Sequence, residues 1–549
     1  MKKIMACMLS LLLCFSFFAA CGGNADDGSE ANVVIMNDNV VYYDELSDGG
    51  FDLVVSVTGT EKKDLLYLLD QEKDYVSVNE NGGVSVSSAV SDNYAFTVTA
   101  VLKANRSKYH AADFVLRYTR GVITGERRVG QVVVTINGDP SSSRGISWFT
   151  SHDVAESDVW ISESSDMSAA KKYEGERKVF EKAAEAGDKE KTAFYNHQCV
   201  ISGLKPATTY YYKVGSEKMS LYSDVGKFRT AAVSGAVRFL LTTDVHIGAN
   251  ETASPSRRFY HAALSDAMSR ADIDFALNTG DMVTMWNGGY SYFESEWARA
   301  MNISPLLKEI TFVPVAGNHD QKHERAAGTY AEHRYSMVNH YSLPQSPAEI
   351  ADGNVNGPNY SFDISNAHFV VMNIYDSDQP QTEIEKIGAW LEKDLAATDK
   401  QWKIAFSHRE VPDDIKAVLE KYGVTAAYSG HEHFYTRSAP MLGGAVQSAT
   451  WGGEGDDYII DPKGTTYVTN TTTGGADEFR AAETDLHDID FFGSGSVFGS
   501  HGAATARWGM YTLITIDDDT FTAELYVRPG TTSDVPFELY ATYGFMLSE

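Results

Sequence analysis

The sequence is poor in cysteine, in basic residues and in long apolar runs, and each scarcity excludes a class of protein. Four cysteines occur in 549 residues, and because Cys7, Cys14 and Cys21 lie near the N-terminus, Cys199 alone remains for the rest of the chain. A disulfide framework and a thiolate metal site are therefore both excluded. After the first twenty residues, no stretch has the ~18 uninterrupted apolar residues of a membrane-spanning helix.

Basic residues are outnumbered by acidic ones. The chain has 46 Lys+Arg against 75 Asp+Glu, for a formal net charge of −29. This balance argues against a basic surface that binds polyanions, so no nucleic acid partner is expected. An acidic protein that binds phosphate needs a strong local positive charge, which bound metal ions would supply.

The N-terminus has the pattern of a secretory leader. Lys2 and Lys3 precede an apolar run over residues 4–18, and Ala19-Ala20-Cys21 follows. The pattern predicts a signal peptide over residues 1–20 and a lipid-modified Cys21, with a plain cleaved signal or an uncleaved anchor as alternatives. Residues 21–32 are then a polar tether. We expect a cell-envelope lipoprotein outside the cytoplasm, or a secreted protein, whose only membrane contact is the lipid at Cys21.

The length predicts two to four domains, and the 43% hydrophobic and 22% charged residues are typical of a globular protein. Strand-like runs separated by polar turns predict an immunoglobulin-like β-sandwich over residues 33–138. A second β unit, residues 139–232, ends in Leu204-x-Pro206-x-Thr208-x-Tyr210. This pattern resembles the tyrosine corner of fibronectin type III domains, so Tyr210 and Trp148 are expected in the core. From residue 233 to 549 strands alternate with helical patterns, which predicts a layered α/β domain.

Polar motifs follow five of the predicted strands of the last domain. They are Asp244-Val-His246, Gly280-Asp281, Gly317-Asn318-His319-Asp320, Ser407-His408 and Gly430-His431-Glu432-His433. Ligands of α/β sheets collect at the carboxyl ends of strands, which is where these motifs lie. They offer two carboxylates, four imidazoles and one amide, a donor set that suits Fe, Mn or Zn. The alternative, that these residues are only turn formers and helix caps, is disfavoured by the ordered occurrence of all five motifs.

The series D-x-H, G-D, G-N-H-D, H and G-H-x-H resembles the calcineurin-like metallophosphoesterase superfamily. The preceding fibronectin-like unit, the segments 359–363 and 430–437, and Gly474-Gly475 are similar to the purple acid phosphatases. The resemblance covers the chain from about Ser141 to the C-terminus. It implies an α/β metallophosphoesterase domain, a four-layer β-sandwich flanked by helices, that follows two all-β sandwich domains.

The resemblance also implies a pair of metal ions. Carried over motif by motif, it assigns one ion to Asp244, His246, Asp281 and His433, and the other to Asp281, Asn318, His408 and His431, so that Asp281 bridges. Purple enzymes have a tyrosine three residues after the bridging aspartate, where this chain has Thr284, and His246 supplies the replacement ligand. No tyrosinate colour is therefore predicted.

Three further residues are candidates for catalysis. A metal-bound hydroxide would attack phosphorus in line with the leaving alcohol. We expect His319 to act as a general acid or transition-state donor, and Asp320 either to orient its ring or to cap a helix. Arg437 is expected either to hold phosphate oxygens or to form a salt bridge between domains.

The sequence thus predicts an exported, acid-phosphatase-like enzyme that hydrolyses small phosphorylated substrates, with phosphomonoesters expected. One alternative is a surface binding or adhesion lipoprotein that uses the phosphoesterase fold as a platform, which the complete ligand set disfavours. Another is a phosphodiesterase or nuclease of the same superfamily, and the acidic composition argues against the nuclease. The natural substrate, the native metal pair and the oligomeric state are not indicated by the sequence.

Overall fold

The computed structural model describes most of the chain after residue 31. The described residues are 32–35, 37, 40–42, 50–58, 61–69, 76–86, 94–104, 108–117, 129–150, 154–182, 192–247, 256–284, 290–301, 305–320, 340–344, 359–375, 379–453, 457–474, 478–480, 504–528 and 535–548. The predicted signal peptide and the lipid-modified Cys21 lie outside these residues. None of the helices in the described part is both long enough and apolar enough to span a bilayer.

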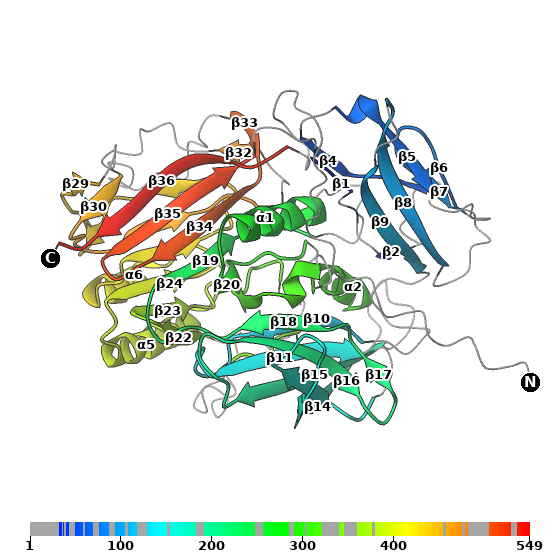
Figure 1. The fold of residues 1–549 in the computed structure, drawn as a ribbon. Helices are drawn as coiled ribbons and strands as arrows, with labels where there is room; N and C mark the ends of the chain where they lie inside the picture. The colour runs from blue at the N-terminus through cyan, green and yellow to red at the C-terminus, as the bar shows by residue number, and fades with distance from the viewer. Residues whose placement is uncertain are drawn as a thin grey trace, which may run out of the picture.

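The N-terminal strands form a small β structure of their own (Figure 1). One sheet has the order β2-β9-β8-β5, a second has the order β3-β7-β6, and β1 pairs with β4. Phe114 is fully buried between the strands and stacks on Phe96 with 5.2 Å between ring centroids. The bounds are β1 Asn32–Ile35, β2 Val40–Tyr42, β3 Gly50–Asp52, β4 Val55–Thr58, β5 Leu65–Leu69, β6 Val76–Val78, β7 Gly83–Val86, β8 Tyr94–Leu102 and β9 Lys108–Arg117, with a short 3-10 helix, η2, at Lys62–Asp64.

A second group of strands packs as two facing sheets. Trp148 and Tyr210 are both buried between them, which confirms the core positions predicted for them. The hydroxyl oxygen of Tyr210 accepts a hydrogen bond of 2.9 Å from the backbone N–H of Lys205, as in a tyrosine corner. Burial in the same core raises the pKa of the free Cys199 thiol to about 11. The bounds are β10 Val129–Thr135, β11 Ser143–Thr150, β12 Asp158–Ser162, β13 Lys171–Glu174, β14 Glu176–Lys182, β15 Thr192–Ser202, β16 Thr209–Ser216, β17 Leu221–Tyr222 and β18 Gly226–Arg229.

Strand β10 connects this second group with the C-terminal part of the chain. The residues of β10 fall within the first predicted sandwich, residues 33–138. In the structure β10 pairs with β11 on one side and, in parallel, with β21 (Thr311–Pro314) on the other. A single sheet therefore runs through both parts in the order β14-β15-β11-β10-β21-β20-β19-β34-β35-β36-β30-β29. Buried polar contacts add to this junction, including Arg144 Nε to Thr311 Oγ1 at 3.1 Å.

The C-terminal part is built from two sheets packed face to face. The first is the continuation of the sheet just described, and the second has the order β22-β23-β24-β25-β31-β26. Phe239 lies between the sheets, with its ring centroid 5.6 Å from Phe369 and 6.0 Å from Phe406. The bounds are β19 Val237–Thr242, β20 Phe275–Asn278, β22 Tyr360–Ile364, β23 Ala367–Val371, β24 Trp402–Phe406, β25 Ala426–Ser429, β26 Thr436–Arg437, β29 Thr450–Gly452, β30 Tyr458–Ile460, β31 Thr466–Thr469, β34 Met510–Ile516, β35 Thr520–Val527 and β36 Glu538–Met546.

Helices cover the two outer faces of this pair of sheets (Figure 1). Helices α5 (Gln381–Ala397) and α6 (Asp413–Lys421) pack together on the second sheet, and α1 (Ser256–Arg270) packs near β34. The apolar side chains that recur at helical spacing along α5 are all buried, namely Ile384, Ile387, Leu391 and Leu395. The remaining elements are α2 Tyr290–Met301, the 3-10 helix η3 Pro305–Lys308, and two hairpins, β27 Met441–Leu442 with β28 Ala445–Val446 and β32 Glu478–Arg480 with β33 Ala504–Trp508. Helix, sheet, sheet and helix therefore form the layers of the predicted fold class.

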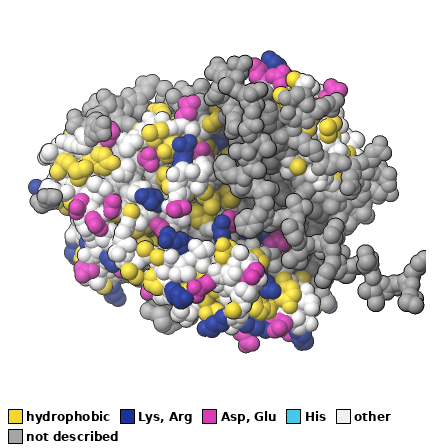
Figure 2. All heavy atoms as spheres, in the orientation of Figure 1, with side chains coloured by type: hydrophobic (Ala, Val, Ile, Leu, Met, Phe, Trp, Pro, Cys, Tyr) yellow, Lys and Arg dark blue, Asp and Glu magenta, His cyan; other side chains and the backbone are white. Residues whose placement is uncertain are grey.

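Acidic and basic side chains are interspersed over the described part of the face drawn in Figure 2. Ion pairs among the described residues include Lys416 with Glu410 at 2.7 Å and Lys205 with Glu163 at 2.7 Å. Exposed pairs of this kind contribute about 0–1 kcal/mol each, so the fold depends on its apolar core rather than on them.

A charged network around the buried His368 joins β22, β23 and α5. His368 Nδ1 lies 2.6 Å from Asp363 Oδ1, and His368 Nε2 lies 2.9 Å from Asp394 Oδ2. Burial lowers the pKa of His368, but hydrogen bonds to the two carboxylates outweigh that effect and raise the pKa to about 9. The imidazolium is therefore the form that the folded protein stabilises at neutral pH.

This network predicts a pH-dependent stability. Because the pKa in the folded state is above the ordinary value of about 6.5, the contribution is complete below about pH 6.5 and is lost as the pH rises through about 9. In urea unfolding at pH 6 and pH 10, we expect the stability advantage of the parent over His368→Gln to shrink at the higher pH. An advantage that stays constant across this range would contradict the assignment.

Candidate metal centre

The five motifs lie at strand ends that meet in the structure. Strands β19, β20 and β21 are parallel neighbours in the first sheet, and β23, β24 and β25 are parallel neighbours in the second. Parallel strands end on the same side of a sheet, so the segments that follow them lie together. The predicted ligands are in these segments, at Asp244, His246, Asp281, Asn318, His408, His431 and His433.

Left-handed backbone conformations are concentrated in the same segments. Twelve non-glycine residues of the described part have positive φ, and five of them are Asp244, His246, Asp281, His431 and His433, with φ between 48° and 72°. This conformation is uncommon for residues other than glycine and costs about 1–3 kcal/mol each in strained cases. The fold therefore maintains an unfavourable backbone at the positions where the side chains must turn inward.

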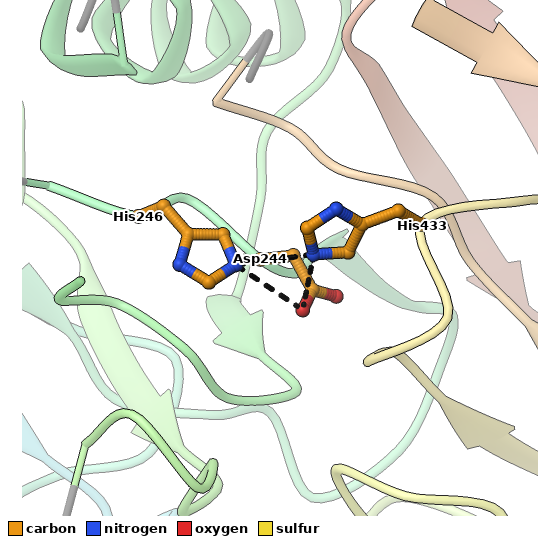
Figure 3. A group of neighbouring side chains, drawn as sticks. All are labelled: Asp244, His246 and His433. Atoms are coloured by element: carbon orange, nitrogen blue, oxygen red, sulfur yellow. Dashed lines mark hydrogen bonds and ion pairs between the residues drawn. The ribbon is translucent and has the colours of Figure 1, made fainter. Parts of the chain in front are cut away.

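A first group of donors consists of Asp244, His246 and His433 (Figure 3). The Nε2 atom of His433 lies 3.4 Å from Asp244 Oδ1, and that of His246 lies 3.8 Å from the same oxygen. The two Nε2 atoms are 3.1 Å apart. Three donor atoms thus face one small volume, as the ligands of a cation do.

A second group consists of Asp281, His408 and His431, with Asn318 beside them. His408 Nε2 lies 3.2 Å from Asp281 Oδ2 and 2.9 Å from Asn318 Oδ1, and His431 Nδ1 lies 3.0 Å from Asn318 Oδ1. His408 Nδ1 lies 2.9 Å from the carbonyl oxygen of Thr279. Donation of the Nδ1 proton to that carbonyl leaves the lone pair on Nε2, which faces the group.

Asp281 connects the two groups. Its Oδ2 atom lies 3.8 Å from His246 Nε2 in addition to the 3.2 Å contact with His408. Burial alone would raise the pKa of Asp281, but the charges of His408 and His246 outweigh burial and hold the pKa at about 2. A carboxylate in this position can serve two cations at once.

The burial and protonation of the donor atoms suit metal ions. Asp244 is fully buried, and its Oδ1 atom has no hydrogen-bond partner, while Oδ2 accepts hydrogen bonds from Thr243 Oγ1 at 2.6 Å and from the backbone N–H of His431 at 2.9 Å. A buried carboxylate oxygen without a donor is costly unless a cation satisfies it. Burial is the main cause that lowers the pKa of His246 and of His431 to about 4, which leaves both rings neutral and able to bind metal at neutral pH.

His319 borders both Asp281 and His246. Its backbone N–H donates to Asp281 Oδ1 at 2.8 Å, its Nε2 lies 3.9 Å from Asp281 Oδ2, and its ring is edge-on to His246. Its Nδ1 lies 2.5 Å from the carbonyl oxygen of Thr284. This contact orients the ring so that Nε2 points into the space between the two groups.

The carboxylate of Asp320 binds backbone N–H groups. Its Oδ1 accepts hydrogen bonds from Met282 N–H at 2.8 Å and Val283 N–H at 3.2 Å, and its Oδ2 accepts one from Gly317 N–H at 3.0 Å. Burial and the charge of Asp281 raise the pKa of Asp320 to about 7. The geometry gives Asp320 a backbone-binding role that links the segments after β20 and β21, in addition to the two roles predicted for it.

Arg437 packs on an aromatic ring. Its Cζ atom lies 4.4 Å from the ring centroid of Tyr543 in β36, and the Tyr543 hydroxyl is hydrogen-bonded to that of Tyr428 at 2.8 Å. A guanidinium over an aromatic face is a stabilising cation–π contact. This contact gives Arg437 a packing role between β26 and β36, which neither of its predicted roles includes.

Several residues that support the site were not predicted from the sequence. Thr471 Oγ1 donates to the carbonyl oxygen of His433 at 2.7 Å, and Thr472 Oγ1 donates to that of Asp244 at 2.6 Å. The run of three threonines after β31 is the sequence signal that could have indicated them. Arg409 was also missed, although it follows His408 directly, and its Nη1 lies 2.5 Å from His431 Nε2.

Gly317 provides room for Asp281. A Cβ atom at Gly317 would overlap both Oδ1 and the backbone nitrogen of Asp281. The absence of a side chain therefore lets the segments after β20 and β21 approach each other closely.

We predict that Gly317→Ala weakens metal binding. The added methyl group must displace the bridging carboxylate, and overpacking of this kind costs about 1–3 kcal/mol. Metal content after dialysis against a weak chelator measures the effect. Gly388→Ala in α5 is the matched control, because its Cβ would lie 3.4 Å from Ile415 Cδ1, an ordinary contact. Equal metal content in the two variants would contradict the prediction.

Comparison with known proteins agrees with this geometry. Residues 129–230 match the family model of the purple acid phosphatase N-terminal domain, and residues 237–435 match the model of the calcineurin-like phosphoesterases. Purple acid phosphatase 23 of Arabidopsis thaliana is 22% identical over 335 residues, which cover 53% of this chain and 64% of that protein. Fe(3+)-Zn(2+) purple acid phosphatase 12 of the same plant is 25% identical over 271 residues, 45% of this chain and 53% of that protein. The chain thus spans less than two thirds of the length of these relatives.

A solved structure extends the agreement to the fold. A purple acid phosphatase from yellow lupin (Lupinus luteus) seeds superposes with a TM-score of 0.57 at 14% sequence identity, over 94% of this chain and 96% of that one. The first family model begins at β10, in agreement with the pairing of β10 with β11. The chain therefore contains an N-terminal domain of the purple acid phosphatase type, residues 129–230, followed by a calcineurin-like phosphoesterase domain, residues 237–435.

Proposed function

We propose that this chain is a dinuclear-metal phosphoesterase that hydrolyses phosphomonoesters outside the cytoplasm. The observation that carries the proposal is the position of Asp281 Oδ2, which is 3.8 Å from His246 Nε2 in one donor group and 3.2 Å from His408 Nε2 in the other. Paired metal sites in hydrolases use such a shared carboxylate to keep two ions about 3.5–4 Å apart. The leader pattern of residues 1–21 supports export.

The proposed ligands divide as the two donor groups do. Asp244, His246 and His433 would hold one ion, Asn318, His408 and His431 the other, and Asp281 both. The ions would supply a nucleophile from water at neutral pH and polarise the phosphoryl oxygens. Oxygen and nitrogen donors without sulfur suit Zn, Mn or Fe.

His319 is the proposed proton donor to the leaving group. The 2.5 Å contact between its Nδ1 and the Thr284 carbonyl fixes the ring and leaves Nε2 as the atom that exchanges a proton. Asp320 is proposed as a positioning residue, because the three backbone N–H groups that it binds belong to the segments that carry Asp281 and Asn318. Arg437 remains a candidate for binding phosphate, because the stacking of its guanidinium on the ring of Tyr543 does not use the in-plane N–H donors.

The central test is hydrolysis by metal-reconstituted protein. We expect turnover of an aryl phosphate monoester, faster than that of the corresponding diester. Asp281→Ala removes the shared ligand and is expected to lower kcat by more than about 100-fold while the protein remains folded by circular dichroism. Full activity in Asp281→Ala would overturn the proposal, and a preference for the diester would overturn its substrate class.

Metal binding is expected to stabilise the folded protein. An ion that binds only the native state at a concentration of 100 times its Kd adds about 2.7 kcal/mol to the free energy of unfolding. Thermal unfolding of chelator-treated protein with and without added Zn²⁺ or Mn²⁺ measures the shift. A melting temperature that does not respond to either ion would contradict a metal site.

The iron-loaded protein is predicted to lack an intense visible charge-transfer band. The residue three positions after Asp281 is Thr284, whose side chain has no phenolate to bind Fe(III). An absorption spectrum of the iron-reconstituted chain is the measurement. A strong visible band would show that a tyrosine from elsewhere in the chain reaches the metal.

A further inference from the structure

Arg409 lies directly beside the second donor group and has no role in the function proposed above. It follows His408 at the carboxyl end of β24, where its backbone N–H donates to the carbonyl oxygen of Ile374 at 3.0 Å. Its side chain is one quarter exposed, with Nη1 2.5 Å from His431 Nε2 and Nη2 3.7 Å from Glu432 Oε1. The guanidinium is thus at the boundary between the donor group and solvent.

The two ring nitrogens of His431 face different partners. Nδ1 lies 3.0 Å from Asn318 Oδ1 and 3.2 Å from His408 Nε2, within the donor group, whereas Nε2 faces Arg409. An imidazole that binds a cation through Nδ1 uses the lone pair of that atom, so the proton of the neutral ring is on Nε2. The guanidinium has five N–H donors and no acceptor. Two donors cannot remain 2.5 Å apart, so Arg409 would move away from the ring when Nδ1 holds a cation.

The displaced guanidinium has two available partners. One is the carboxylate of Glu432, which at 3.7 Å is in range of a weak ion pair on the surface. The other is an anion bound at the metal pair, which the planar fork of arginine can bind through two parallel N–H···O hydrogen bonds. The contact of Arg409 with the bound anion is the more stabilising of the two, because charge-assisted hydrogen bonds in a partly desolvated site are stronger than an exposed ion pair.

We propose that Arg409 is a binding residue for the phosphate group of the substrate, released from His431 when that ring binds metal. The proposal rests on the proposed phosphoesterase function, since it requires an anion at the same site. In this role Arg409 adds one positive charge beside the ions, and this charge favours a phosphomonoester dianion over a diester monoanion. Arg409 is thereby assigned to the choice of substrate class.

The experiment uses the full chain loaded with Zn²⁺ and measures the Kd of inorganic phosphate by calorimetry. Arg409→Gln is expected to weaken phosphate binding by about tenfold or more, because a charge-assisted contact is lost. Arg409→Lys, which keeps the charge and loses the fork, is expected to lie between Arg409→Gln and the parent. Lys416→Gln is the matched control, since it removes one positive charge from α6 where the described partners are Glu410 at 2.7 Å and Asp413 at 3.5 Å.

Zinc content by atomic absorption is measured on every variant. Unchanged zinc content with phosphate binding weakened by about fivefold or more supports the proposal. A smaller effect on phosphate binding would overturn it, and so would loss of zinc from Arg409→Gln, which would show that Arg409 supports His431 instead. A parent protein that binds phosphate through Arg409 but hydrolyses no phosphate ester would contradict the proposed function and leave the binding role of Arg409 standing.

Discussion

Two fully buried carboxylates, Asp244 and Asp281, are the constraint on which the rest of this structure depends. Withdrawing a carboxylate from water costs several kcal/mol, and hydrogen bonds to the imidazoles around it compensate only where those rings carry protons. Burial disfavours protonation in His246 and His431, whose pKa values fall to about 4. Buried negative charge beside the neutral rings of His246 and His431 is the electrostatic description of a cation site. Burial lowers the pKa of His408, but Asp281 outweighs burial and raises it to about 9, which is the same demand for positive charge. Two sheets supply this arrangement, because both carboxylates follow parallel strands of the first sheet and His408 and His431 follow parallel strands of the second.

The surroundings of the site show how the fold maintains it. Five of its residues have a left-handed backbone, and such strain persists only where neighbouring groups overdetermine the conformation. Here the neighbours are hydroxyls and a carboxylate that bind main-chain atoms. Thr471 and Thr472 bind the carbonyls of His433 and Asp244, and Asp320 binds three N–H groups. The strained backbone lowers the stability of the fold, but it fixes the donor atoms in positions that need little rearrangement when a ligand binds.

Local patterns in the sequence predicted local structure well and predicted long-range pairing poorly. Residues 94–102, 510–516 and 520–527 are dense runs of β-branched or aromatic residues, the pattern that predicts strands, and each forms one strand. The similar run 51–57 is divided between β3 and β4. The metal-site motifs could be found because each is contiguous and follows a strand. The hydrogen bonds of Asp320 with Met282 and Val283 and the contact of Arg409 with His431 could not, because they join residues 22 to 38 positions apart.

The pairing of β10 with β21 has a consequence for how the chain can be divided. Cutting before Val237, at the start of the phosphoesterase family match, would strip β21 of its neighbour and uncover a row of unpaired main-chain groups on a buried, apolar strand. An unpaired strand edge of this kind pairs with other chains and promotes aggregation. The preceding β unit thus covers the edge of β21, and we expect the two parts, which share one sheet, not to be separated cleanly by truncation at this point.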